Sequence, residues 1–415
     1  MNESAGAKVG VIGLGVGYAL ACCLAEAGYE TVGIDIDPEV VANPRIDPSV
    51  ERLRKYDSKH RNNIDRLLQL STDYVKLSNC DYVTVCVSTG DERELVLGHV
   101  EGAIDRYCGL AKEGATMIVY STLPFGSSKR IKQIIEDKGL TCDEDVRYVY
   151  MPLMIAQGTT ADDFVNPPFV AFGSYSSVNA QDALSFYKDF VVSSSLWKKE
   201  LPPMFVTTPE TAELAKLTAN AFLSAKMSFA NMTDMLCKKV GVDSAKLLSI
   251  VGSDWRIGSK MLKPGFAWGG NCFPRDTQSL VDTYSEYGVD SGILSSALEL
   301  NETRSLEPYS ILLSSNIRDG PVLVLGLAYK SGVHITSGSK SLQLLRHLQA
   351  RGYDATGYDP NVNPDQSHGI SKKDYRAVIV TTDEPCFDQI ISEAKRRNPE
   401  LLILDYRMPK GFSAK

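Results

Sequence analysis

The feature that most constrains this 415-residue chain is a strand, a glycine turn, a helix and a second strand that follow one another over residues 8–37. The turn contains Gly13, Gly15, Val16 and Gly17. A unit of this length, with glycines between the first strand and the helix, is typical of dinucleotide binding because backbone N–H groups at a helix N-terminus hold a pyrophosphate. The sequence therefore predicts a Rossmann-like unit at the start of the chain.

Asp35 ends the second strand of this unit, where an acid commonly accepts hydrogen bonds from an adenosine ribose. A carboxylate there repels a 2′-phosphate, so NAD is favoured over NADP as the cofactor. The glycine pattern is irregular: Tyr18 stands where the third glycine is expected and Gly17 precedes it, which predicts a turn shortened by one residue. The alternative is that the glycines only tighten a strand-to-helix turn and that Asp35 is a solvated strand end.

The run from Val9 to Ala25 carries no charge and also resembles a signal-peptide core or a short membrane span. Its glycines break it into strand, turn and helix, so we expect no membrane association. Nine dispersed cysteines, without a CxxC pair or a Cys/His zinc spacing, predict reduced thiols, a cytoplasmic protein and no metal site. The formal net charge of −7 argues against a nucleic-acid partner.

The last hundred residues repeat the alternation of apolar strands with helices, and their second strand-like run also ends in an acid, Asp359. Short strands that are apolar on both faces imply parallel sheets covered by helices. Between the two ends, a long helical pattern runs from Pro209 to about Val240, and more helix is expected from Thr277 to about Arg304. The predicted fold class is α/β, with two Rossmann-like doubly wound parallel-sheet domains joined by a long central helix. The expected domains are 1–205 for NAD, 206–304 for the helical middle and 305–415 for a second nucleotide site.

The loop before residue 277 combines three glycines, a proline and charged residues around one thiol, Cys272. Pro274 resembles the opening of a helix, so Cys272 is predicted just before a helix N-terminus, a position that lowers a thiol's pKa and favours a nucleophile. On the long helix, Glu213, Lys216 and Asn220 share one face. For Glu213 the favoured interpretation is a solvated surface residue.

These segments resemble the UDP-glucose/GDP-mannose dehydrogenase family. The resemblance runs nearly end to end and includes STLPFG at 121–126, ELAKLTANAFLSAKMSFAN at 213–231, RIGSKMLKPGFAWGGNCFPRD at 256–276 and GLAYK at 326–330. CFPRD and RIGSK look closer to the UDP-glucose members than to the others. The resemblance implies oxidation of a nucleotide sugar at C6, with NAD, through a covalent intermediate on a cysteine, in a homodimer formed through the central helix.

The resemblance also implies roles for individual residues. Cys272 would be the nucleophile, Lys216 and Asp276 the polar pair acting on the C6 oxygen or a water, and Asn220 a stabiliser of the oxyanion. Thr122 would contact NAD. The expected substrate contacts are Arg256, Lys260, Phe266, Gly269 and Lys330.

The chain departs from the family pattern at three places. The family usually has glutamates in the segment MPLMIAQG, where this chain has Leu153 and Gln157, neither of which can take a proton from water. After GLAYK, His334 and Ser337 occupy places where an acidic pair and an arginine are expected, and Met232 replaces a common glutamate.

Three hypotheses follow from the sequence. The first is a UDP-sugar 6-dehydrogenase that converts UDP-glucose to UDP-glucuronate. The second keeps the enzyme but stops at the thioester or aldehyde, or takes another UDP- or GDP-sugar. The third is a nucleotide-binding regulator that has lost catalysis.

Overall fold

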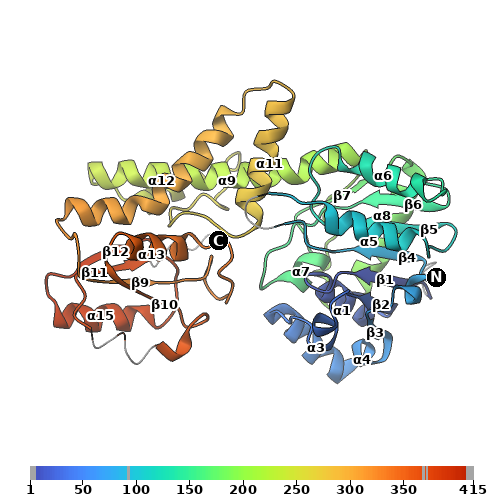
Figure 1. The fold of residues 1–415 in the computed structure, drawn as a ribbon, viewed down its shortest axis with the longest axis horizontal. Helices are drawn as coiled ribbons and strands as arrows, with labels where there is room; N and C mark the ends of the chain where they lie inside the picture. Colours follow the sequence, from blue (N-terminus) through green and yellow to red (C-terminus); the bar gives the residue numbers. More distant parts are fainter. Residues whose placement is uncertain (1–5, 91–93, 367–369, 371–372, 408–415) are drawn as a thin grey trace. The chain divides into compact units, whose positions relative to one another are not determined.

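The computed structural model describes residues 6–90, 94–366, 370 and 373–407. Apart from a short stretch around residues 91–94, the chain divides into two compact units, of which unit 1 ends at Leu217 and unit 2 begins at Thr218. The division falls inside helix α9 (Pro209–Val240), which has the bounds that the sequence predicts. Each unit contains its own β-sheet (Figure 1).

Unit 1 is built on an eight-stranded sheet in the order β3-β2-β1-β4-β5-β6-β7-β8. Neighbouring strands are parallel except β6 and β7, which are antiparallel. The chain moves outward on one side from β1 and returns to β4 on the other, so the carboxyl ends of β1 and β4 form the switch point where such sheets bind ligands. The strands are β1 (Lys8–Ile12), β2 (Glu30–Ile34), β3 (Leu68–Ser71), β4 (Tyr82–Val85), β5 (Ala115–Val119), β6 (Val146–Tyr150), β7 (Val170–Gly173) and β8 (Met204–Thr207).

Helices cover both faces of this sheet. One apolar core joins the sheet to α1, α3, α4, α7 and α8, and the other joins it to α5 and α6. The helices and the 3-10 turn are α1 (Gly17–Ala27), α2 (Pro38–Ala42), α3 (Pro48–His60), α4 (Asn63–Leu67), η1 (Tyr74–Leu77), α5 (Gly98–Cys108), α6 (Ser127–Asp137), α7 (Thr160–Val165) and α8 (Ser177–Ser193). Helix α1 is buried on nearly all sides, because it packs against four of these helices and three strands.

Unit 2 contains the rest of α9 and a four-stranded parallel sheet in the order β10-β9-β11-β12. Its strands are β9 (Pro321–Leu325), β10 (Asp354–Tyr358), β11 (Ala377–Val380) and β12 (Leu402–Asp405). Its other elements are α10 (Ser244–Gly252), α11 (Cys272–Glu286), α12 (Gly292–Ser314), α13 (Lys340–Ala350), η2 (Pro364–Gln366) and α15 (Phe387–Arg397). The α/β class with two doubly wound sheets and a long central helix is thereby confirmed.

The helix expected over residues 277–304 is present as α11 and α12, which together begin earlier and end later than predicted. The two helices are separated where Gly288 adopts a left-handed φ of 66° just after α11. Strands β3, β7 and β8 were not anticipated, since each is only four residues long and partly exposed or lies near an edge of the sheet.

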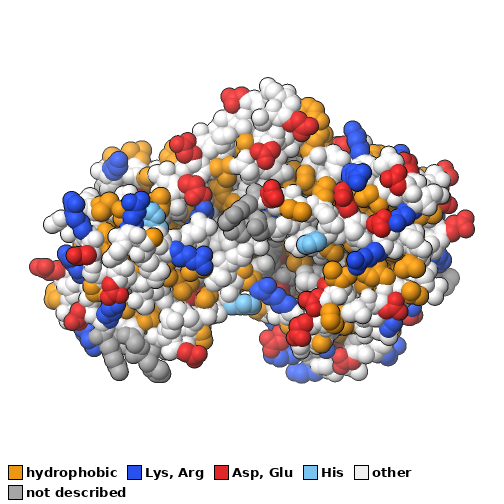
Figure 2. Space-filling view, in the orientation of Figure 1, with side chains coloured by type: hydrophobic (Ala, Val, Ile, Leu, Met, Phe, Trp, Pro, Cys, Tyr) orange, Lys and Arg blue, Asp and Glu red, His pale blue; other side chains and the backbone are white. Residues whose placement is uncertain are grey.

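The uncharged run near the N-terminus is strand β1 followed by helix α1, as predicted. Among the described helices, none is both long and apolar enough to cross a membrane. Acidic and basic side chains are interspersed over the face drawn in Figure 2. Within the described residues, no group of three or more His, Cys, Asp or Glu side chains is arranged to hold a metal ion.

Candidate active site

The glycine turn after β1 is shaped by close contact with the segment that follows β4. Gly13 has a φ of 90°, and a Cβ there would lie 2.9 Å from the backbone carbonyl of Cys86. A Cβ on Gly17 would lie 2.9 Å from the Cβ of Cys86 and 3.0 Å from Val11. Gly17 therefore makes the close helix–strand approach that the third glycine of such motifs makes, and α1 begins directly at this residue.

Asp35 closes the same turn from the end of β2. Its carboxylate accepts the Leu14 N–H at 2.8 Å and the Asp37 N–H at 3.0 Å, and the side chain is half-buried. A carboxylate has about four acceptor positions, so Asp35 retains capacity for a ribose hydroxyl. Gly15 and Val16 are exposed, and a Cβ on Gly15 would meet nothing within 4 Å. The turn thus offers open backbone at the start of a helix, which suits a dinucleotide phosphate.

Glu213 is buried, with no exposed surface, so its interpretation as a solvated residue is wrong. Its carboxylate accepts the Gly126 N–H, the Ser128 N–H and the Ser128 hydroxyl, each within 2.7 Å. Burial raises the pKa of Glu213 and outweighs these hydrogen bonds, which lower it. The side chain fastens α9 to the N-terminus of α6, directly after the turn that carries half-buried Thr122.

Lys216 lies one turn beyond Glu213, on the part of α9 that belongs to unit 1, and is 5% exposed. The start of α9 is seated closely on β7, because a Cβ on Gly173 would lie 2.8 Å from the Cα of Pro209. The backbone that carries Lys216 is therefore fixed by packing within unit 1.

In unit 2, the structure brings together Asn220 from α9 and Asp276 from α11. The Asn220 side-chain N–H donates to Asp276 at 2.6 Å, and both side chains are buried. Arg275 donates to the other oxygen of Asp276 from Nε at 3.1 Å and from an Nη at 3.0 Å. Two donors of different charge therefore hold the Asp276 carboxylate in one orientation inside unit 2.

Cys272 is the first residue of α11, so the helix begins two residues earlier than Pro274 indicated. All nine cysteines are free thiols, and Cys272 is the exposed one. Burial raises the pKa of Cys22, Cys80 and Cys108 to about 11. The geometry therefore separates exposed Cys272 from seven buried thiols, and Cys386, before α15, is half-buried.

The five residues predicted to contact substrate lie in unit 2. Arg256 and Lys260 are exposed, and Arg256 pairs with Asp254 through contacts of 2.6–3.1 Å. Phe266 packs edge-on against Tyr406, with ring centres 5.3 Å apart, and half-buried Lys330 lies 5.8 Å from the centre of the Tyr329 ring. Gly269 is buried.

Two polar residues that the sequence interpretation missed hold the Gly265 backbone of this loop. Asn231 accepts the Gly265 N–H at 2.9 Å and donates to the Phe266 carbonyl at 3.2 Å. Arg304, 1% exposed, donates to the Gly265 carbonyl at 3.0 and 2.8 Å and pairs with Asp234 at 2.6 Å. A polar side chain within a long helix is the only local hint of either role.

The chain matches three models of one family in sequence order. They are the NAD binding domain (residues 7–191), the central domain (210–303) and the UDP binding domain (323–409) of the UDP-glucose/GDP-mannose dehydrogenase family. The chain belongs to this family. Its members are NAD-dependent nucleotide-sugar 6-dehydrogenases, and NAD is the cofactor of the N-terminal domain.

Members of the family with different substrates resemble the chain about equally. The UDP-glucose 6-dehydrogenase AglM of Haloferax volcanii is 28% identical over 89% of this chain and 86% of its own length. The UDP-glucose 6-dehydrogenase TuaD of Bacillus subtilis is 29% identical over 87% of this chain and 77% of its own length. The GDP-mannose 6-dehydrogenase of Pseudomonas aeruginosa is 27% identical over 88% of this chain and 84% of its own length. The comparisons therefore establish the substrate class, a nucleotide sugar.

Solved structures of family members share the fold. A UDP-glucose dehydrogenase from Pyrobaculum islandicum superposes with a TM-score of 0.82 at 23% identity and covers 99% of both chains. A UDP-D-ManNAc dehydrogenase from Pyrococcus horikoshii gives 0.82 at 25% identity, over 98% of this chain and 96% of its own.

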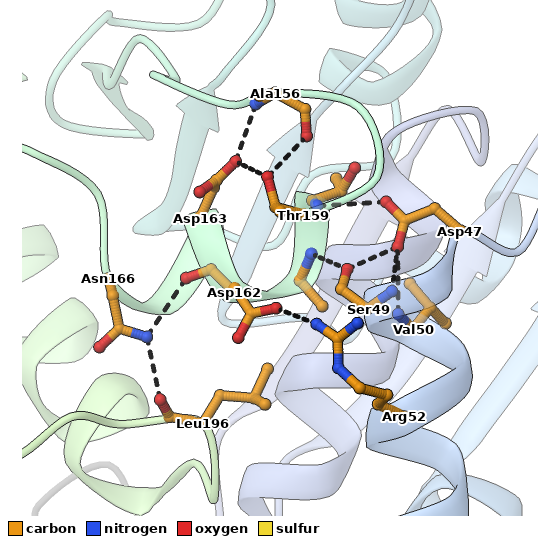
Figure 3. A network of polar contacts seen from close by, with 12 residues as sticks. Asp47, Ser49, Val50, Arg52, Ala156, Thr159, Asp162, Asp163, Asn166 and Leu196 are labelled. Carbon is orange, nitrogen blue, oxygen red and sulfur yellow. Dashed lines mark hydrogen bonds and ion pairs between the residues drawn. The ribbon is translucent and has the colours of Figure 1, made fainter. Parts of the chain in front are cut away.

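The first departure from the family pattern, Leu153, is a packing residue. It is half-buried and packs against the apolar core of unit 1 that includes α1 and α8. The segment that carries Leu153 and Gln157 is fastened by the polar network in Figure 3. Asp163 accepts the Ala156 N–H and the Thr159 hydroxyl at 2.8 and 2.7 Å, and Asp47 accepts the Thr160 N–H at 3.1 Å. An ion pair of 2.7 Å between Arg52 and Asp162 also joins α3 to α7.

The other two departures lie in unit 2. Ser337 donates a hydrogen bond to the side-chain oxygen of Asn271 at 2.7 Å, directly before Cys272. Met232 is 48% exposed on α9. His334 is exposed.

Proposed function

We propose that this protein oxidises the C6 primary alcohol of UDP-glucose to the carboxylate of UDP-glucuronate. The observation that carries the proposal is the single exposed thiol, Cys272, at the start of the helix that also holds Asp276 against Asn220. The likeness of CFPRD and RIGSK to UDP-glucose members supports the choice of sugar nucleotide, as do the AglM and TuaD relatives. NAD accepts the hydride in each of the two oxidations.

In the proposed mechanism, Lys216 and Asp276 act as the pair that removes the proton of the C6 hydroxyl, directly or through a water, during the first oxidation. This oxidation gives an aldehyde. The Cys272 thiolate then forms an S–C6 bond, and the carbonyl π electrons become the oxyanion of a thiohemiacetal. Asp276 uses one of the two Asn220 side-chain N–H groups, and the other is the proposed donor to this oxyanion. Loss of hydride from C6 leaves a thioester, and water cleaves its C–S bond to give the carboxylate and the free thiol.

The decisive experiment incubates purified protein with NAD and a panel of UDP- and GDP-sugars, and counts the NADH formed per sugar consumed. We expect two NADH per UDP-glucose, together with free UDP-glucuronate. Cys272→Ser should abolish uronate formation while leaving the fold unchanged by circular dichroism. Absence of turnover on every nucleotide sugar would refute the proposal and favour a non-catalytic nucleotide-binding regulator, whereas turnover on a different sugar would change only the substrate.

A second outcome is favoured by Leu153, which packs on an apolar core and has no group that accepts a proton from water. Without that base, the reaction would stop at the thioester or release the aldehyde. Intact-mass spectrometry after incubation with UDP-glucose and NAD distinguishes the outcomes. A lasting adduct that disappears in Cys272→Ala indicates a stalled thioester, whereas two NADH and free uronate exclude it.

We also propose that the protein forms a homodimer through α9. Five apolar residues on this helix are 48–67% exposed, and their spacing places them on one face. They are Phe222, Phe229, Met232, Leu236 and Val240. Light scattering during size-exclusion chromatography should give twice the chain mass for the wild type and the single mass for Phe229→Glu. A monomeric wild type would contradict this proposal.

We also propose a role for each of three domains. Residues 1–205 bind NAD, residues 206–304 carry the nucleophile and the dimer face, and residues 305–415 bind the UDP-sugar. Limited proteolysis in the presence of each ligand tests this division.

The free state of all nine thiols supports a cytoplasmic location, which cell fractionation tests.

A further inference from the structure

Arg256 and Lys260, two of the predicted substrate contacts, lie in the turn formed by residues 254–261, shortly after α10, and both are exposed. The Asp254 carbonyl accepts the N–H groups of the third and fourth residues after it, at 3.0 and 2.8 Å. The Asp254 carboxylate accepts the Arg256 N–H at 3.0 Å and also pairs with the Arg256 side chain. Asp254 therefore shapes the first half of the turn and orients one of its two cations.

The end of the 254–261 turn has a backbone conformation that needs support from its surroundings. Met261 has a left-handed φ of 60°, which a residue with a Cβ rarely adopts unless the surrounding structure fixes it. A Cβ on Gly252 would lie 3.0 Å from the Cα of Ser259, so the end of α10 is in close contact with the turn. Buried Leu262, just beyond the turn, belongs to a small apolar cluster with side chains of α9 and α10. Packing therefore fixes the second half of the turn at its end.

The middle of the turn is held by one charged side chain of α9. Half-buried Lys226 donates from Nζ to the Ile257 carbonyl at 2.8 Å and to the Gly258 carbonyl at 2.9 Å. These two carbonyls lie in the sequence between Arg256 and Lys260. Hydrogen bonds from an ammonium are stronger than those from a neutral donor, and a lysine offers three N–H groups. Lys226 therefore ties the segment between the two exposed cations to the long helix.

We infer that Lys226 is a positioning residue for substrate binding: its ammonium fixes the 254–261 turn so that Arg256 and Lys260 are held in place for the diphosphate of a nucleotide sugar. Cations that are ordered before binding hold a diphosphate more tightly, because less conformational entropy is lost on binding. Without Lys226, the middle of the turn would lose both of these bonds to α9, and the left-handed Met261 would favour rearrangement. Lys226 donates to backbone carbonyls, so it acts on the substrate through the turn.

The inference rests on the proposed function, since it takes Arg256 and Lys260 as substrate contacts, but its test needs no turnover. Isothermal titration calorimetry measures the Kd values of UDP-glucose, GDP-mannose and NAD for the wild type and for variants of Lys226. Lys226→Met keeps an unbranched side chain but has no N–H donor, so we expect the Kd of the nucleotide sugar that binds the wild type to rise about five- to twentyfold. The Kd of NAD should change less than about twofold, because NAD is the cofactor of the N-terminal domain. Lys226→Arg, whose guanidinium can donate to two oxygens at once, should restore most of the affinity.

Two comparisons separate this role from a general loss of charge or of stability. Lys239→Met is the matched control, because Lys239 is an exposed lysine in the last turn of α9, and it should bind the nucleotide sugar like the wild type. Hydrogen exchange of the backbone amides in peptides that cover residues 253–262 should be faster in Lys226→Met than in the wild type or in Lys239→Met.

An unchanged Kd or unchanged hydrogen exchange in Lys226→Met, an equal loss of affinity in Lys239→Met, or no rescue by Lys226→Arg would overturn the inference. A wild type that binds neither nucleotide sugar would also overturn it. A wild type that binds a nucleotide sugar without oxidising it would refute the proposed function alone. Weaker binding of GDP-mannose in Lys226→Met, with no binding of UDP-glucose to the wild type, would change the proposed substrate and still support the inference.

Discussion

The glycine turns that open the two sheets have nearly the same backbone contacts. Gly13 and Gly326 have φ angles of 90° and 95°, and each N–H donates at 2.8 Å to the last residue of the neighbouring strand, Ile34 or Tyr358. An aspartate then accepts an N–H just after each glycine, because Asp35 and Asp359 follow those strands. Similar local sequence thus gives a similar local turn in both units.

The two turns differ in what surrounds the aspartate and in where the next helix begins. Asp35 is half-buried and accepts two backbone N–H groups, whereas Asp359 is fully buried and accepts three. Helix α1 begins directly behind the first turn, but α13 begins only at Lys340. The first turn therefore offers an accessible acid and a helix N-terminus to a dinucleotide, while the second uses its acid internally and sends its long loop to the cysteine loop.

The largest expected difference between the turns is in stability. Asp359→Ala leaves the N–H groups of buried Leu327 and Ala328, and that of exposed Asn361, without their acceptor, and should lower the free energy of unfolding of unit 2 by about 3 kcal/mol. Asp35→Ala should cost less, about 1 kcal/mol, because only one of its two partners, Leu14, is buried and the half-buried position of Asp35 lets water replace the carboxylate. Urea unfolding followed by tryptophan fluorescence, to which buried Trp268 of unit 2 contributes, and by far-UV circular dichroism measures both effects. Equal losses of stability in the two variants would contradict the inference that Asp359 is used internally while Asp35 is accessible.

The next effect concerns cofactor choice. Asp35→Asn removes the charge that repels a 2′-phosphate and weakens the contact to the ribose, so KM for NAD should rise about tenfold and the preference for NAD over NADP should fall. Asp359→Asn is the matched control and should leave that preference unchanged. Initial rates with each cofactor at saturating nucleotide sugar make the measurement. A shift in preference in the Asp359 variant would show that the second turn also contacts the dinucleotide.

The sequence predicted what depends on local chain properties. The shortened glycine turn, the bounds of α9 and the placement of Cys272 at a helix start follow from glycine, proline and apolar spacing within a few residues. The contact of Ser337 with Asn271 joins positions in different parts of the fold, and nothing near either residue predicts it. Family resemblance made Ser337 look like the loss of an arginine, whereas the structure gives it a partner beside the nucleophile.

Glu213 was misjudged for a different physical reason. On α9 the usual polarity of a surface helix is partly inverted, because Glu213 and Lys216 are buried while Phe222 and Phe229 are exposed. The helical spacing of these residues indicates that they lie on different faces of α9, but it does not indicate which face the fold buries. Only the Gly126 and Ser128 donors of α6, brought in by the tertiary fold, reveal that a buried carboxylate is stable there.

Replacement of the Glu213 carboxylate tests whether this residue positions the turn that carries Thr122, the predicted NAD contact. Glu213→Gln keeps the size of the side chain but turns an amide N–H toward at least one of the donors that now bind Glu213, so the turn carrying Thr122 should loosen. We expect kcat/KM for NAD to fall about tenfold, with KM for the nucleotide sugar changed less than about twofold. Glu210→Gln, one turn earlier on α9, serves as the control and should behave like the wild type. Equal behaviour of the two variants would mean that Glu213 is only a structural residue.

The smallest effect is the pH dependence of stability, for which α9 carries an internal comparison. Burial raises the pKa of Glu213 above 4.5, since its partners are neutral donors, so the stability it contributes is present below that pH and is lost as pH rises through the folded-state pKa. Burial also acts to raise the pKa of Asp234, but hydrogen bonds from Ser244 and Lys238 and the charge of Arg304 outweigh it and lower the pKa below 3.8. Its contribution is therefore present above that pH and is lost as pH falls.

Unfolding midpoints in urea at about pH 2.5 and about pH 7 check these opposite signs, because the contribution of Asp234 is lost only below 3.8. Relative to the wild type, Glu213→Gln should lose more stability at the lower pH, and Asp234→Asn more at the higher pH, each by on the order of 1 kcal/mol between the two conditions. The same sign for both variants would contradict the assignment, because it would mean that the cations around Asp234 do not distinguish it from Glu213. Since both carboxylates project from one helix, a difference in sign must come from what each unit packs against it.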